Sequence, residues 1–189
     1  MSSGNRNSFI LLQFLTVVRI PLAILLASVL FVFDNTAFNI IITAVIIIAL
    51  IEISDLLDGY LARKFDIVSE WGAMLDPYAD SISRLIVFWG FSNSGLVTPL
   101  VPISMAFRDI TVAYCRITLT RYNMTVSAKL SGKIKAIIQG VCAFIIVIGP
   151  LYWKYTGKWT ISALSWIVII ATLGSIVEYA KSAMAAVKS

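Results

Sequence analysis

Residues 55–80 read DLLDGYLARKFDIVSEWGAMLDPYAD and carry two pairs of aspartates within a chain that is 59 % hydrophobic. Asp55 and Asp58 are three residues apart, and Asp76 and Asp80 are four apart. At about 100° per residue, either spacing puts both carboxylates of a pair on one face of a helix. The polar stretch between the pairs is short enough to join two antiparallel helices. The segment therefore predicts two helices whose acidic faces converge near one connection.

The rest of the chain is apolar enough to lie in a membrane. Charged residues make up 13 % of the 189 residues, well below the roughly 25 % of soluble domains, and the mean hydropathy is +0.91. A membrane-spanning helix needs about 20 predominantly apolar residues. Six predicted spans, two of them interrupted by charges, are residues 9–33, 38–53, 72–96, 98–121, 134–153 and 159–179. We therefore predict an all-α polytopic membrane protein with six transmembrane helices in a single domain over residues 1–189.

The N-terminal stretch allows two interpretations. We expect residues 9–15 to begin as a short interfacial helix that leads into the first span. The alternative is a cleavable signal peptide, but residues 9–33 are long for its apolar region, and Arg19 and Pro21 interrupt them.

The lysines and arginines predict which side of the membrane the aspartates face. Cytoplasmic loops carry an excess of these residues. With the N-terminus inside, the outer loops hold only Lys154 and Lys158. The inner side holds Arg6, Arg63, Lys64, Arg121, Lys129, Lys133, Lys135, Lys181 and Lys188. We expect residues 55–80 to face the cytoplasm, and membrane topology explains the basic residues without a nucleic-acid partner.

The aspartate pairs predict a site for divalent cations. Four neighbouring carboxylates repel one another unless positive charge lies between them, and acids at membrane depth need a partner or a cavity. The chain has no histidine, so catalysis must rely on carboxylates. Oxygen ligands favour Mg2+ or Mn2+, and two such ions can share a carboxylate. We predict that two ions bind to Asp55, Asp58, Asp76 and Asp80; the alternative is that these acids pair with Arg63, Lys64 and Arg84.

Small residues accompany the acids. Gly59 follows Asp58 directly and Gly72 lies one turn before Asp76, so a ligand could pack closely against the backbone there. The planar donor fork of Arg63 suits a phosphate group.

These residues together resemble the motif of the CDP-alcohol phosphotransferase family. Every position of that motif is matched by Asp55-x2-Asp58-Gly59-x2-Ala62-Arg63-x8-Gly72-x3-Asp76-x3-Asp80. The resemblance implies transfer of a phosphatidyl-type group from a CDP-linked lipid, or of a phosphoalcohol from a CDP-alcohol, to an acceptor hydroxyl, with release of CMP. It also implies a membrane lipid substrate and a homodimer.

The resemblance further implies a role for each motif residue. The first three aspartates would hold the metal that clamps the CDP pyrophosphate. Asp80 would join the metal cluster and act as the base for the acceptor hydroxyl. The cytidine diphosphate pocket would be lined by Gly59, Ala62, Arg63 and Gly72.

Three further stretches resemble bacterial phosphatidylglycerophosphate synthases. They are FLTVVRI (residues 14–20), RDITVAYCR (108–116) and SGKIKAIIQ (131–139). This resemblance implies CDP-diacylglycerol as donor, glycerol 3-phosphate as acceptor, and a bacterial inner membrane. The chain departs from these synthases after Asp80, where SISRL replaces an expected lysine, so inositol phosphate, serine or another alcohol remains an alternative acceptor.

Basic residues near the inner ends of the fourth and fifth predicted spans suit an anionic acceptor. We predict that Arg116, Lys133 and Lys135 bind its phosphate, while the positive-inside rule alone is the alternative explanation. Arg108 lies deeper in its span and is expected to pair with Asp109.

Two other functions are alternatives for the chain as a whole. A divalent-cation transporter would use acids near the bilayer centre, but these acids lie near one membrane face, and Gly59 and Arg63 would have no role in it. An inactive scaffold would be expected to lose the motif, which is intact.

Overall fold

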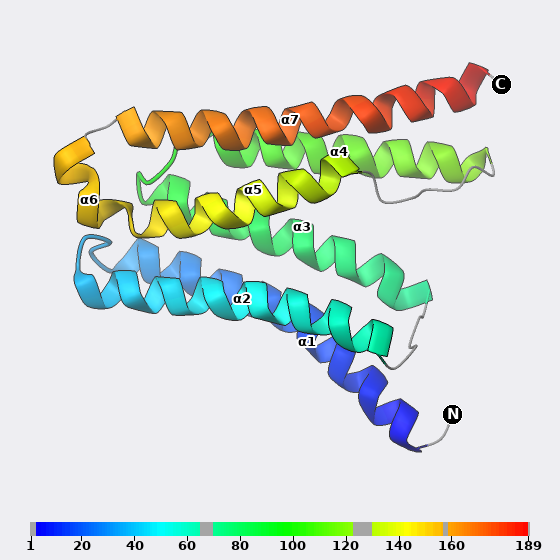
Figure 1. The fold of residues 1–189 in the computed structure, drawn as a ribbon, viewed down its shortest axis with the longest axis horizontal. Helices are drawn as coiled ribbons and strands as arrows, with labels where there is room; N and C mark the ends of the chain where they lie inside the picture. The colour runs from blue at the N-terminus through cyan, green and yellow to red at the C-terminus, as the bar shows by residue number, and fades with distance from the viewer. Residues whose placement is uncertain (1–2, 65–69, 123–129, 157–158, 189) are drawn as a thin grey trace. The chain divides into compact units, whose positions relative to one another are not determined.

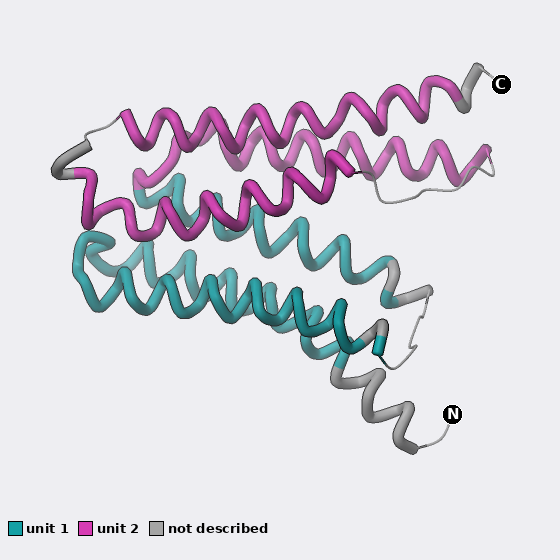
Figure 2. The backbone as a smooth tube through the Cα atoms, in the orientation of Figure 1, with its two compact units in different colours: residues 1–94 teal, residues 95–189 magenta. Residues whose placement is uncertain are grey.

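The computed structural model describes residues 3–64, 70–122, 130–156 and 159–188, and every regular element in them is an α-helix. The helices are α1 (Ser3–Val32), α2 (Phe38–Lys64), α3 (Glu70–Asn93), α4 (Leu100–Arg121), α5 (Leu130–Val147), α6 (Gly149–Thr156) and α7 (Trp159–Lys188) (Figure 1). The all-α prediction is confirmed. The chain divides into two compact units, residues 1–94 and 95–189 (Figure 2), and each is described by itself.

Four of the described helices are long and apolar enough to cross a membrane. They are Leu12–Val32, Phe38–Leu61, Leu130–Val147 and Trp159–Ala185. The six-span prediction is thus supported for four spans, and the count of six is not confirmed. Helices α3 and α4 have 24 and 22 residues, but both carry charged side chains along their length. These are the two spans that the sequence shows as interrupted by charges.

The first unit is built around α1, which packs against both α2 and α3. Helix α2 runs antiparallel to α1, whereas α3 runs parallel to it (Figure 1). Helix α1 is continuous from Ser3, so residues 9–15 belong to the same helix as the first span. The hydroxyl of Ser54 donates a hydrogen bond to the carbonyl of Leu15 (2.6 Å), which ties α2 to α1 close to the first aspartate pair.

Helices α1 and α3 approach closely where small residues meet. Gly90 of α3 lies against Ala27 of α1, and a Cβ atom added to Gly90 would lie 2.9 Å from the Cα atom of Ala27. The neighbouring atom belongs to backbone, so it cannot move aside as a flexible side chain would. The α1–α3 pair that carries Arg19 and Asp76 therefore depends on a glycine at this position.

Gly90→Ala is expected to lower the free energy of unfolding in detergent by about 1–3 kcal/mol, because the added methyl group overpacks this crossing. Gly174→Ala in α7 is the matched control, since a Cβ atom there meets nothing within 4 Å. The control should be neutral or stabilising, because alanine is the better helix former. Equal loss of stability in both variants, measured by thermal unfolding, would contradict the close approach.

The second unit is built around α7, which packs against α4 and α5. Within it, the amide of Gln139 donates to the hydroxyl of Thr172 (2.9 Å), so a buried polar contact joins α5 to α7. The prediction of one continuous span over residues 134–153 is wrong. Two helices cover these residues, because α5 ends at Val147 and α6 begins at Gly149. Pro150 fits the break: it has no N–H to continue the hydrogen-bond pattern of α5, and it lies instead in the first turn of α6, where a proline is well tolerated.

Large apolar side chains are exposed on both units. Phe31 and Ile46 are examples in the first unit, and Phe107 and Ile170 in the second. Exposed apolar surface of this extent marks contact with lipid or another protein. It agrees with the membrane character of the four apolar helices.

Candidate functional site

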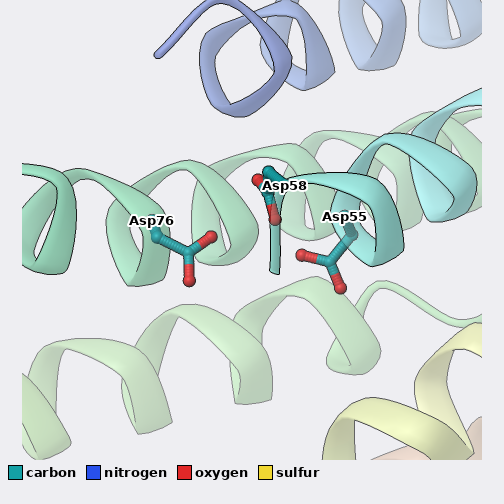
Figure 3. A group of neighbouring side chains, drawn as sticks. All are labelled: Asp55, Asp58 and Asp76. Carbon is teal, nitrogen blue, oxygen red and sulfur yellow. The ribbon is translucent and has the colours of Figure 1, made fainter. Parts of the chain in front are cut away.

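Three aspartates converge between α2 and α3 in the first unit. Asp55 and Asp58 belong to α2 and Asp76 to α3, and one carboxylate oxygen of each lies within 4.8 Å of the others. Asp58 is buried, Asp55 is partly buried and Asp76 is exposed. The side chains of Asp55 and Asp76 reach toward Asp58 from opposite sides (Figure 3). The predicted convergence of the two helix faces is confirmed for these residues, while their metal-binding role stays a prediction.

The guanidinium of Arg19 lies among these carboxylates. Only 1 % of this residue of α1 is exposed. Its Nη1 donates to Oδ1 of Asp55, and its Nη2 donates to Oδ2 of Asp58 (2.5 Å) and Oδ1 of Asp76 (2.7 Å). Its Nε donates to the backbone carbonyl of Thr16 (3.3 Å), and the side-chain hydroxyl of Thr16 donates to Oδ2 of Asp58 (3.2 Å). The three acids are thus paired with a basic side chain, as the alternative interpretation required, although Arg19 was not among the expected partners.

Sequence reasoning missed Arg19 as a member of the site. The signal was present, because Arg19 is the only charged residue in the predicted span over residues 9–33. An isolated arginine at that depth requires a partner. No spacing rule connects it to acids 36 residues or more further along the chain, so only the fold identifies them.

Asp80 has a different environment. Its Oδ1 accepts a hydrogen bond from Nε of Arg84 (2.6 Å), one turn further along α3. Nη1 of Arg84 in turn donates to Oε1 of Glu52 (2.9 Å) on α2. Glu52 lies three residues before Asp55 on the same helix face, and it was not predicted. Arg84 therefore links the two helices beside the cluster, and its predicted alternative pairing is observed for Asp80.

The residues predicted to line a nucleotide pocket are described only in part. Gly59 and Gly72 are partly buried, on the same helices as the three converging aspartates. The side chains of Ala62 and Arg63 lie outside the described residues, so their assignment stays a prediction.

A second polar cluster lies among α4, α5 and α7 in the second unit. Arg108 donates from Nη1 to Oδ1 of Asp109 (2.7 Å) and from Nε to the hydroxyl of Ser175 (2.9 Å). The expected Arg108–Asp109 pair is therefore confirmed. Lys135, only 3 % exposed, places its Nζ 3.8 Å from Oδ1 of Asp109. Two buried cations thus share one carboxylate.

Arg116 joins this cluster through Tyr179. Its Cζ lies 5.6 Å from the centre of the Tyr179 ring, and the Cζ of Arg108 lies 5.8 Å from the same ring centre. Nη2 of Arg116 donates to the Tyr179 hydroxyl (3.5 Å), whereas its buried Nε has no hydrogen-bond partner among the described residues. Leaving a buried donor unpaired is costly, so this group suits an incoming acceptor atom. Lys133 is exposed on α5, so the structure brings Arg116 and Lys135 into the cluster but not Lys133.

The fold and the first cluster define a helical membrane protein with a carboxylate site suited to a hard cation. The sequence profile of the CDP-alcohol phosphatidyltransferase family matches residues 9–177, which span both units. The chain belongs to this family of transferases.

Three curated relatives have modest identity to the chain. The relative from Haemophilus influenzae is 30 % identical over 134 residues, covering 67 % of this chain and 69 % of the relative. That from Bacillus subtilis is 27 % identical over 163 residues (85 % and 74 %), and that from Escherichia coli K12 is 28 % identical over 148 residues (75 % and 79 %). Each is named CDP-diacylglycerol–glycerol-3-phosphate 3-phosphatidyltransferase.

Proposed function

We propose that this protein transfers the phosphatidyl group of CDP-diacylglycerol to a hydroxyl of glycerol 3-phosphate and releases CMP, as a step of phospholipid biosynthesis. The observation that carries the proposal is the convergence of Asp55, Asp58 and Asp76 in a chain of this family. The names of the three relatives support the choice of donor and acceptor.

The three converging aspartates are the proposed ligands of Mg2+ or Mn2+, with Asp80 completing a site for two ions. Their donor set fits these cations, because it consists of carboxylate oxygens that lie within 4.8 Å of one another. When bound, the cations would offset the charge that develops on the pyrophosphate as CMP leaves. Gly59, Ala62, Arg63 and Gly72 are proposed to line the cytidine diphosphate pocket, where Arg63 would donate to a phosphate.

Asp80 is the proposed general base. The acceptor oxygen forms a bond to the β-phosphorus of the CDP-lipid, and the bond from that phosphorus to the oxygen of CMP breaks. The proton of the acceptor hydroxyl passes to the carboxylate of Asp80, which must lie within hydrogen-bond reach of it. Arg84 holds Oδ1 of that carboxylate (2.6 Å) and so restricts its orientation.

The acceptor phosphate is proposed to bind Arg116 and Lys135, with Lys133 at the surface. Support comes from the burial of Lys135 and from the buried Nε of Arg116, which has no hydrogen-bond partner among the described residues. Buried cations of this kind suit a phosphate-bearing polyol. Inositol phosphate, serine and other alcohols are the alternative acceptors; family membership argues against a cation transporter.

For topology, we propose that α3 and α4 complete six spans in a bacterial inner membrane and that the connection between α2 and α3 faces the cytoplasm. The positive-inside distribution of lysine and arginine supports this orientation. A homodimer is proposed from the family resemblance.

Lys135→Gln is expected to raise the KM for glycerol 3-phosphate by roughly ten- to a hundredfold, the equivalent of about 1.5–3 kcal/mol for one charge-assisted contact. The KM for CDP-diacylglycerol should change little, because other residues hold that substrate. Lys181→Gln is the matched control: it removes an exposed cation from the same unit, so it should alter membrane insertion at most. An unchanged acceptor KM in Lys135→Gln would remove this lysine from the site.

A further inference from the structure

Arg19 contacts the three aspartates that the proposed function assigns to a metal ion. Its two terminal nitrogens reach one carboxylate oxygen on each of Asp55, Asp58 and Asp76. A guanidinium and a divalent cation cannot share those oxygens at such short distances without strong repulsion between the two positive groups. The buried arginine is therefore more than a general counter-charge, because it already occupies one oxygen of each carboxylate.

We propose that Arg19 is an internal competitor of the divalent cation: it pairs the three aspartates in the metal-free protein, and it must withdraw from them when the metal binds. The inference rests on the proposed function, because it takes these aspartates to be metal ligands. It assigns a positioning role to a residue that lies outside the aspartate motif and comes from a different helix, α1.

The competition has two consequences that follow from the contacts. Without metal, Arg19 offsets the repulsion among the carboxylates and keeps α2 and α3 together. With metal, Arg19 loses its three carboxylate contacts and keeps the Thr16 carbonyl, to which Nε donates at 3.3 Å. The cost of that exchange weakens metal binding to the protein, so removal of the arginine should strengthen it.

The test is Mn2+ binding to the purified protein in detergent, without nucleotide. The affinity is measured by titration calorimetry. Arg19→Gln should bind Mn2+ about tenfold or more tightly than the unmodified protein, within the usual range of coupling between two sites. Arg19→Lys keeps the charge but cannot donate to three carboxylates as a fork, so its affinity should lie between the two. Lys181→Gln is the control for loss of one exposed positive charge, and it should change affinity by less than about threefold because solvent screens it.

Thermal unfolding provides a second readout. In EDTA, Arg19→Gln should melt below the unmodified protein, because three carboxylates then lose the guanidinium that offsets their repulsion. Saturating Mn2+ should raise its Tm by more than it raises the Tm of the unmodified protein, since linkage requires the tighter binder to gain more.

The outcomes separate this inference from the proposed function. Weaker or equal Mn2+ binding by Arg19→Gln would overturn the competition while leaving the metal site intact. If Arg19→Gln does not fold even with Mn2+, Arg19→Lys decides, and affinity equal to or below that of the unmodified protein would overturn the proposal. Absence of Mn2+ binding in every variant would overturn the metal site itself, and the competition with it.

Discussion

Asp58→Asn is expected to reduce CMP release by on the order of 10³-fold or more, the size of effect seen when a preorganised electrostatic group is removed from an active site. Asp58 is the buried member of the converging aspartates, and both Arg19 and Thr16 donate to its Oδ2. Asparagine keeps the shape and one oxygen but loses the charge that a divalent cation requires. The measurement is initial CMP release with saturating substrates, together with Mn2+ affinity of the same preparation.

The matched control is Asp34→Asn, the same exchange at an exposed turn of the same unit. Asp34 accepts hydrogen bonds from the backbone N–H and hydroxyl of Thr36, and asparagine can accept both through its own oxygen. Its CMP release should stay within about twofold of the unmodified protein, the scale of an exposed substitution. Undiminished release from Asp58→Asn would refute the assignment of the aspartates as the catalytic metal site.

Asp80→Asn should lower turnover by about 10²-fold or more while binding of CDP-diacylglycerol is retained, because the amide cannot accept a proton. The substitution is structurally conservative, since the remaining oxygen can still accept from Nε of Arg84. Single-turnover rates and direct binding of the CDP-lipid check the two parts of this expectation separately.

Glu52→Gln distinguishes loss of the base from disturbance of Arg84. Glu52 is the other carboxylate held by Arg84, with Nη1 to Oε1 at 2.9 Å. If Asp80 acts as base, Glu52→Gln should reduce turnover by less than about tenfold, well short of the loss expected for a general base. If Asp80→Asn lost turnover only because it no longer bound the CDP-lipid, Asp80 would be a metal ligand and not the base.

Local spacing predicted the parts of the fold and site that depend on a single helix. The separations within the two aspartate pairs place their carboxylates on helix faces, and the short connection brings Asp58 and Asp76 together. Arg108 and Asp109 are adjacent in sequence, so their pairing in the apolar α4 was also foreseeable. Each of these predictions needed only helical geometry and the cost of an unpaired charge in an apolar setting.

Contacts between distant segments could not be predicted in the same way. Arg19 reaches its acids because α1 packs against α2 and α3, which no sequence periodicity encodes. The break before α6 has a different cause: Pro150 lies within an apolar run, so hydropathy alone predicts one continuous span where the chain forms two helices. Charged residues in α3 and α4 interrupt the other two predicted spans, which the length and composition of these helices do not confirm, although the same charges carry the proposed chemistry.

The central claim is that a divalent cation on the α2–α3 aspartates enables transfer from CDP-diacylglycerol to glycerol 3-phosphate. The most direct test is CMP release by the purified protein with CDP-diacylglycerol as donor. The acceptors are glycerol 3-phosphate, inositol phosphate and serine, and each is measured with Mg2+, with Mn2+ and with EDTA. We predict release that requires both glycerol 3-phosphate and a divalent cation. Turnover only with another acceptor would reject glycerol 3-phosphate while leaving the transferase chemistry intact. CMP release that persists undiminished in EDTA would contradict the account, and so would the absence of release with any hydroxyl acceptor.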